Sequence, residues 1–361
     1  MTTLTLSLSA LTHNFSLIRT KLHSRTRLIG VVKADAYGLG SIPIAKRLID
    51  EGVTYLAVAF ASEGIALRQA GIQCPILVFY PQWDCFPSLI QHCLQPVLYS
   101  QDCWKAFCKT AQLQKVVHYP VHVKFNTGLN RTGFSFNDCE WIAKQLENKT
   151  LALQSVYSHL AASEEAQPNA ATTAQWKGFQ KIKSFFETRE PNVFFHLLNT
   201  SGIFNYPHWQ MDAVRVGIGL YGFANRPEWD LQLEPIAKLE THIVQIHSIK
   251  KGETVGYNPS WVASEERQIA VLPLGHADGI GRQFGNGKGK VRIHNQYATI
   301  VGNVCMDMLM VDVSSIACKV GDPAVLFDKQ SPLQHWAKTG DTLTYEVLTG
   351  LSKRIARKIE F

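Results

Sequence analysis

Residues 27–40, RLIGVVKADAYGLG, join a short aliphatic run to a lysine and a glycine-rich segment. The run from Leu28 to Val32 predicts a buried strand, because it is short, apolar and rich in β-branched residues. Lys33 then stands at the carboxyl end of that strand, and Gly38 and Gly40 flank a predicted helix start. A strand, a loop and a helix in this order form the repeating unit of parallel α/β folds.

The same unit recurs over the first two thirds of the chain. Candidate strands end near Val32, Phe60, Tyr80, Tyr99, Phe125, Ser158, Leu198 and Val216, with amphipathic helical patterns between them. Eight such units predict a closed (β/α)₈ barrel. We expect this barrel to span residues 1–228.

After about Pro227 the pattern changes to alternating strands with turn residues, as in KLETHIVQIHSIKKGE and KVRIHNQYATIVG. This texture predicts a mostly β C-terminal domain over residues 229–361, with which the first few residues of the chain can pair. The last segment, TLTYEVLTGLSKRIARKIEF, predicts one short helix and then a strand.

Composition excludes several classes of protein. The net charge of +7 comes from 36 basic and 29 acidic residues, which are spread along the chain, so we expect no nucleic-acid partner. No apolar run is long enough for a membrane helix, and we expect a cytoplasmic protein. The eight cysteines form no CxxC pair and no zinc-like spacing, which predicts reduced, mostly buried thiols and no metal site.

Polar residues collect where barrel strands end, and active sites of such barrels lie at that face. Lys33 follows the first predicted strand. The residues that end or follow the later strands are Lys124, Arg131, His159, Asn199, Thr200, Ser201, Arg215, Gly217 and Gly219. Hydroxyl groups follow the last two strands, together with backbone N–H groups that glycine leaves accessible. They predict a phosphate-binding site. Alone, Lys33 could simply reach solvent along the rim, and a strand-end histidine could be structural. Their joint placement favours a functional site.

These residues carry a resemblance, since VVKADAYGLG (31–40) resembles the segment with which alanine racemases bind pyridoxal phosphate through a lysine. The stretches that follow in the family's order are KFNTGLNRTGF (124–134), SHLAAS (158–163), HLLNTSG (196–202), VRVGIGLYG (214–222), ETVGY (253–257), LPLGHADGIGR (272–282), VGNVCMDMLMVDV (301–313) and TLTYEVLTGLSKR (342–354). The resemblance implies a homodimer with shared active sites. It also implies interconversion of L- and D-alanine, which supplies D-alanine for peptidoglycan.

The resemblance implies two catalytic bases. Lys33 is similar to the lysine that anchors the cofactor and serves as one base, and Tyr257 to the second base. A free tyrosine with a pKa of about 10 is a poor base at neutral pH, so His159 is the candidate helper. Arg215 matches the arginine that faces the pyridine nitrogen of the cofactor. A guanidinium only donates, so this nitrogen must stay unprotonated.

The remaining implied site residues fall into three sets. The cofactor set includes Tyr37, Asn199, Thr200, Gly217, Ile218 and Tyr345. The substrate set is Arg131, Met306 and Asp307, with Met306, Asp307 and Tyr257 supplied by the partner subunit. The supporting set is Lys124, often carbamylated in the family, with His196 and His276. For Met308 and Met310 we expect a core strand instead.

Three positions depart from the family pattern. Thr200 stands where serine is commoner, Asn126 where aspartate is usual, and His276 where many members have tyrosine at the substrate gate. Other readings stay open: a racemase of broader specificity acting on serine or basic amino acids, or a noncatalytic pyridoxal-phosphate-binding protein. A decarboxylase of ornithine or diaminopimelate type fits less well, because this chain has Arg215 and no glycine triplet.

Overall fold

The computed structural model describes residues 2–361 and divides into two compact units. The barrel unit contains residues 11–36 and 41–233. The β unit contains the segment up to Ala10, residues 37–40 and residues 234–361.

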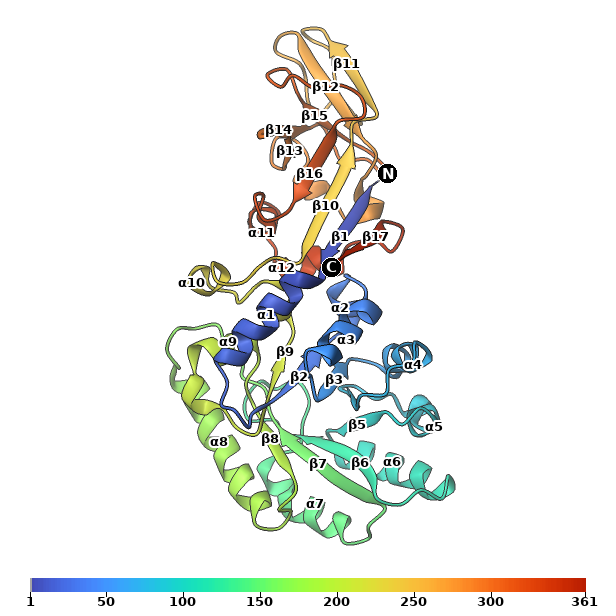
Figure 1. Ribbon diagram of the computed structural model, residues 1–361, viewed down its shortest axis with the longest axis vertical. Helices are drawn as coiled ribbons and strands as arrows, with labels where there is room; N and C mark the ends of the chain where they lie inside the picture. Colours follow the sequence, from blue (N-terminus) through green and yellow to red (C-terminus); the bar gives the residue numbers. More distant parts are fainter. Residues whose placement is uncertain (1) are drawn as a thin grey trace. The chain divides into compact units, whose positions relative to one another are not determined.

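The barrel unit is built on eight parallel strands that close into a barrel, β2 to β9, in chain order (Figure 1). They are β2 (Arg27–Val31), β3 (Tyr55–Val58), β4 (Ile76–Val78), β5 (Gln95–Leu98), β6 (Tyr119–Lys124), β7 (Leu151–Tyr157), β8 (Phe194–His196) and β9 (Ala213–Val216). The last strand pairs with the first, Leu28 opposite Val214. The predicted (β/α)₈ barrel is therefore confirmed.

Helices surround this barrel, as Figure 1 shows. They are α1 (Leu8–Thr20), α3 (Ser41–Asp50), α4 (Ala61–Gln69), α5 (Phe86–Gln91), α6 (Gln101–Leu113), α7 (Cys139–Leu146), α8 (Ala170–Glu187), α9 (Thr200–Asn205) and α10 (Pro227–Asp230), with short 3₁₀ turns η1 (Trp83–Cys85), η2 (Phe136–Asp138), η3 (Pro207–Trp209) and η4 (Ile218–Tyr221). The helices follow the apolar period of 3.6: α8 buries Phe179, Ile182 and Phe186. Its first turn is capped by Asn169, whose side chain accepts the N–H of Thr172.

The segment after Lys33 is not a normal helix start. In α2 (Lys33–Tyr37), the four residues from Ala34 onward have φ between 51° and 60°, which is a left-handed turn. Such a conformation costs about 1–2 kcal/mol per residue. Two carboxylates offset part of this cost, since Glu63 accepts the N–H of Ala34 at 2.5 Å and Asp35 accepts the N–H of Ser41 at 2.7 Å. The right-handed helix begins only at Ser41.

The β unit contains one nine-stranded sheet in the order β11-β12-β15-β14-β13-β16-β10-β1-β17. The strands are β1 (Thr3–Ser7), β10 (Ala237–His242), β11 (Gln245–Ile249), β12 (Arg267–Leu272), β13 (Lys290–Ile293), β14 (Gln296–Val301), β15 (Leu309–Asp312), β16 (Pro323–Phe327) and β17 (Ala356–Glu360), with helices α11 (Leu333–Thr339) and α12 (Thr344–Thr349) and 3₁₀ turns η5 (His276–Asp278) and η6 (Arg282–Phe284). Strand β1 pairs antiparallel with β10 and parallel with β17. The prediction of a mostly β C-terminal domain is confirmed.

The cysteine prediction was only partly right. All eight thiols are free, but only Cys103, Cys108 and Cys139 are buried, and Cys93 is exposed. The buried ones lie on the inner faces of α6 and α7, whereas Cys93 lies in a turn after α5 with φ of 50°. No helix within residues 2–361 has the length and hydropathy needed to cross a membrane.

Candidate active site

Five basic side chains interact with one another at the carboxyl ends of the barrel strands. Lys33 follows β2, Lys124 ends β6, His159 follows β7, and Arg215 lies in β9, while Arg131 comes from the loop after β6. Burial lowers the pKa of Lys33, and the charges of Arg131 and Arg215 lower it further. Burial lowers the pKa of His159 well below its usual value, and the other four cations add to this effect. The barrel mouth is therefore strongly electropositive and suited to an anionic ligand.

Arg215 is held by both of its terminal nitrogens. Nη1 donates to Nδ1 of His196 at 2.8 Å, and Nη2 donates to Nδ1 of His159 at 2.9 Å. The carbonyl oxygens of Ser158 and Leu197 also accept from Nη2, at 2.9 and 3.0 Å. Among residues 2–361, nothing hydrogen-bonds to the Nε–H, which is thus the donor left for a ligand. Burial lowers the pKa of Arg215 only to about 10, so its charge persists at neutral pH.

Tyr80, which we did not single out from the sequence, lies between two of the cations. Its ring centroid is 5.9 Å from Nζ of Lys124 and 6.0 Å from the guanidinium carbon of Arg131. Lys124 also donates to Oγ1 of Thr132 at 2.7 Å. Burial lowers the pKa of Lys124 to about 8, with Arg131 and Arg215 contributing, so much of this amine is neutral near that pH. The strand-end rule could have identified Tyr80, because it lies two residues after the end of β4.

Two more residues of the rim carried no clear sequence signal. The Tyr157 ring packs 4.9 Å from the guanidinium carbon of Arg215, and burial raises the pKa of its phenol. The Glu63 carboxylate accepts the backbone N–H groups of Ala34, Ala59 and Phe60. Glu63 therefore stabilises the left-handed turn beside Lys33.

The loops after β8 and β9 approach each other closely. Oγ1 of Thr200 accepts the N–H of Gly219 at 3.2 Å, and a Cβ on Gly219 would lie only 2.5 Å from Cγ2 of Thr200. Gly217 and Ile218 open η4 beside this contact. Asn199 has a structural task, because its side chain accepts the N–H of Gly202 at 3.0 Å and caps α9.

The other predicted site residues lie in the β unit. Tyr37 and Tyr345 pack with ring centroids 5.8 Å apart, and burial raises the pKa of Tyr37. Tyr257, Met306 and Asp307 line one open hollow of about 680 Å³.

Side chains in this hollow are largely exposed. Tyr257 is 69% exposed and Met306 is 59% exposed. The expectation that Met308 belongs to a core strand was wrong: it is 46% exposed, because it precedes β15 and lines the hollow. Met310 is partly buried against a small cluster that includes Val255 and Ile269.

Asn126 and His276, two of the positions that depart from the family pattern, form hydrogen bonds with nearby loops. Asn126 accepts the N–H groups of Gly128 and Asn130, at 3.1 and 2.9 Å, and so shapes the loop that leads to Arg131. His276 is exposed, and its backbone N–H donates to the carbonyl of Cys305 at 2.9 Å.

Comparison with known proteins identifies the family. The model of the alanine racemase N-terminal domain matches residues 6–225, and that of the alanine racemase C-terminal domain matches residues 236–359. The chain belongs to the alanine racemase family. Alanine racemase 1 of Clostridium acetobutylicum is 34% identical, with 98% of this chain and 93% of the relative covered.

Solved structures of alanine racemases have the same fold. The alanine racemase of Clostridium difficile 630 superposes with a TM-score of 0.93 at 31% identity, covering 99% of this chain and 95% of that one. The alanine racemase of Bartonella henselae, solved with covalently bound pyridoxal phosphate, gives a TM-score of 0.89 at 26% identity, with 99% of each chain covered.

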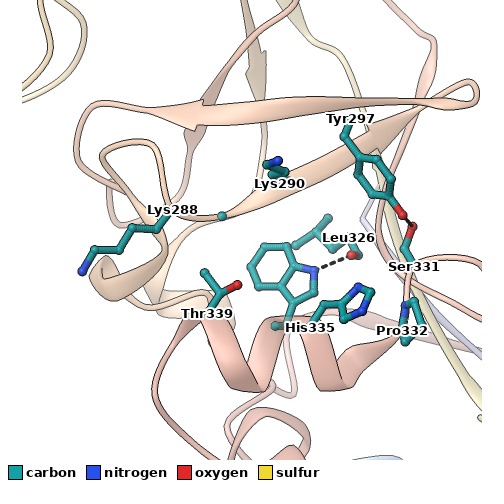
Figure 2. Close-up of a pocket in the computed structure, with 10 residues that line it drawn as sticks. Lys288, Lys290, Tyr297, Leu326, Ser331, Pro332, His335 and Thr339 are labelled. Carbon is teal, nitrogen blue, oxygen red and sulfur yellow. Dashed lines mark hydrogen bonds between the residues drawn. The ribbon is translucent and has the colours of Figure 1, made fainter.

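A second pocket of the β unit has a volume of about 360 Å³ (Figure 2), and none of the sequence stretches that resemble alanine racemases contributes to its lining. Lys288, Lys290 and His335 surround it, and α11 provides one wall. Several of its polar groups are already used: the indole N–H of Trp336 donates to the carbonyl of Leu326, and the Tyr297 and Ser331 hydroxyls bond to each other (Figure 2). None of the predicted alanine racemase site residues lines this pocket.

Acid should destabilise this member of the alanine racemase family through its buried histidines. Burial lowers the pKa of His122 to about 3, and the pKa values of His159 and His196 are also lowered. Below about pH 6.5 the unfolded chain therefore binds protons that the folded chain does not. The free energy of unfolding consequently decreases as the pH is lowered. The expected loss is about 1.4 kcal/mol per pH unit for each histidine.

Denaturant unfolding at pH 7, 6 and 5 measures this slope. In His122→Gln the slope of the free energy of unfolding against pH should decrease by the contribution of one proton, about 1.4 kcal/mol per pH unit. The exposed control His208→Gln should leave the slope unchanged. An unaltered slope in His122→Gln would mean that this ring is already charged in the folded protein.

Proposed function

We infer that Lys33 and Tyr257 are the two bases with which this member of the alanine racemase family interconverts L- and D-alanine. The enzyme is an isomerase, and its cofactor is pyridoxal phosphate. The observation that carries the assignment of Lys33 is its lowered pKa within the electropositive rim, beside Arg215 with its free Nε–H.

The residues of the barrel unit fit this cofactor. The uncommitted Nε–H of the buried Arg215 suits an unprotonated ring nitrogen, because a guanidinium cannot accept. The Thr200 hydroxyl and the Gly217–Gly219 backbone suit a phosphate, in a place where a larger residue at Gly219 has no room. Bound pyridoxal phosphate supplies an electron-withdrawing ring that acidifies the Cα–H bond of the amino acid.

Lys33 anchors the cofactor and moves a proton at one face of the substrate Cα. Its lowered pKa increases the fraction of neutral amine at pH 7 to 8, and only the neutral amine can attack a carbonyl or accept a proton. Arg131 lies next to Lys124 and Tyr80 and binds the substrate carboxylate. Lys124, partly neutral near pH 8, is suited to carbamylation, which would give Arg131 an anionic neighbour.

Tyr257 serves the opposite face of the substrate and comes from the partner subunit of a homodimer. Its exposure on the open hollow of the β unit, together with Met306 and Asp307, supports this assignment. His159 is its helper. Since Arg215 donates to Nδ1 of the neutral His159, the ring proton must be on Nε2, where it can be donated to a phenolate oxygen.

The supporting assignments follow the same division. We assign the phosphate contacts to Tyr37, Thr200, Gly217, Ile218 and Tyr345, and the gate position to His276. Residues 1–228 would form the cofactor-binding domain and residues 229–361 the domain that completes the partner's site. The product D-alanine would serve peptidoglycan synthesis in the cytoplasm.

One assay tests the reaction and its specificity together. Purified protein with pyridoxal phosphate is incubated in D₂O with each L-amino acid, and deuterium at Cα and the D-enantiomer are both measured. We expect exchange and racemisation with alanine well above serine and lysine. Loss of the carboxyl group, or cofactor binding without exchange, would contradict racemisation.

Gly219→Ala should weaken cofactor binding. The new methyl group would lie 2.5 Å from Cγ2 of Thr200, and we expect a loss of about 1–3 kcal/mol of stability and at least about tenfold weaker cofactor affinity. The matched control is Gly178→Ala in α8, where the nearest atom is 3.9 Å away and alanine should stabilise the helix. Absorbance titration of the apoprotein measures both affinities. Equal affinities would remove this loop from the phosphate site.

A further inference from the structure

A chain of four hydrogen bonds crosses the barrel interior through five neighbouring strands, β5 to β9. We call it the interior chain; its members are Gln95, His122, Ser155, His196 and Arg215. Gln95 Oε1 lies 2.9 Å from Nε2 of His122, whose Nδ1 lies 2.6 Å from Oγ of Ser155. The same Oγ lies 3.0 Å from Nε2 of His196, whose Nδ1 lies 2.8 Å from Nη1 of Arg215.

Only one arrangement of protons satisfies the half of the chain next to Arg215. A guanidinium has no acceptor, so Nδ1 of His196 must accept from it. The ring of His196 is neutral, because burial and the charge of Arg215 lower its pKa well below 6.5. Its single proton is therefore on Nε2 and is donated to the Ser155 hydroxyl.

The same reasoning fixes the other half. The Ser155 hydroxyl has one proton, and because it accepts from His196 it must donate to Nδ1 of His122. His122 is also neutral, so its proton is on Nε2 and is donated to the amide oxygen of Gln95. Every bond of the interior chain then has one donor and one acceptor, and its polarity runs from Arg215 to Gln95.

Packing prevents the two imidazole rings from escaping this arrangement. His122, Ser155 and His196 are fully buried, with no exposed surface. The His196 ring stacks on Tyr157 at a centroid distance of 4.7 Å and an angle of 10°. The His122 ring contacts Phe194 edge-on at 6.2 Å. A buried polar group that loses its hydrogen-bond partner is destabilising, so the interior chain is stable only when all of its members are present.

We propose that Ser155 and His122 are positioning residues for Arg215, because they keep His196 in the tautomer that accepts from its guanidinium. The opposite tautomer would direct an imidazole N–H at a guanidinium N–H and displace the arginine. The consequence for the reaction rests on the proposed function, in which the Nε–H of Arg215 faces the cofactor ring. Gln95 ends the chain and supplies its last acceptor.

Steady-state kinetics of variants in the interior chain test whether it positions Arg215 for the reaction. Ser155→Ala should lower kcat about 10- to 100-fold, the range found when a metal ligand loses its hydrogen-bond partner, while KM for alanine stays within about twofold. Ser155→Thr keeps the hydroxyl and should recover most of kcat. Gln95→Met removes the last acceptor and should also lower kcat. Because both changes break one chain, the double variant should be little worse than Ser155→Ala, and effects that simply multiply would contradict the proposal.

Nitrogen-15 NMR of the histidine rings tests the interior chain without any assay of turnover. In the wild-type apoprotein and holoprotein at pH 7.5, His122 and His196 should each show a protonated Nε2 and an unprotonated Nδ1, assigned with His122→Gln and His196→Gln. A proton on Nδ1 of either ring would overturn the proposal, even if Ser155→Ala or Gln95→Met fails to fold. An inactive wild type with these tautomers would instead contradict the proposed function and leave the chain intact.

Discussion

Lys33→Ala should abolish racemisation and covalent attachment of the cofactor together. The side chain is proposed both as the anchor and as one base, and loss of a positioned base alone typically costs about 10²- to 10⁴-fold in rate. We therefore expect a loss of at least about 10⁴-fold in kcat/KM. Chiral chromatography of alanine measures the rate, and visible absorbance with mass spectrometry after borohydride reduction measures the covalent bond.

The matched control is Lys46→Ala, which removes an exposed lysine from α3. It should keep both properties within about twofold, since surface substitutions change little. A Lys33→Ala protein that is still yellow, with cofactor covalently attached, would place the anchor at another lysine.

Tyr257→Phe should abolish proton transfer at one face of the substrate Cα and leave the other face unaffected. The variant loses only a phenolic oxygen from an exposed side chain of the β unit, so folding and cofactor attachment should be unaffected. Racemisation should fall by about 10²- to 10⁴-fold, the range for one positioned acid or base. Tyr297→Phe, a half-exposed tyrosine of the same unit, is the control and should keep its rate.

Exchange of the Cα proton gives a sharper reading of the same variant. With Lys33 in place, Tyr257→Phe should still exchange the proton of one alanine enantiomer while failing to invert it. Loss of exchange from both enantiomers equally would show that Tyr257 supports binding and is not a face-specific base.

Much of the fold could be predicted from local pattern. The barrel strands are short apolar runs buried by helices on the outside, so their ends near Val32, Phe125 and Val216 were visible in the sequence. The rule that sites lie at strand ends then selected Lys33 and Arg215.

The parts that were missed depend on contacts between distant segments. The left-handed turn after Lys33 contains only ordinary residues, and it is held by Glu63, 29 positions away from Ala34. In the sequence, His122 and Ser155 look like ordinary strand residues. The register between neighbouring strands decides which side chains meet inside a closed barrel, and this register cannot be read from one strand alone. Tyr80 could have been selected by its position, but nothing in its local sequence marks it as a neighbour of two cations.

The pairing of β1 has a consequence for synthesis of the protein. Both neighbours of β1, β10 and β17, come from the last part of the chain, and β10 begins roughly 230 residues after β1 ends. At the usual 5–20 residues per second, a ribosome needs about ten to fifty seconds to cover that distance. During that interval Leu4 and Leu6 have no strand beside them, although both are fully buried in the finished sheet. Strand β1 thus waits for its first partner while the whole barrel is being made, and its apolar side chains stay open to chaperones or to aggregation during that time.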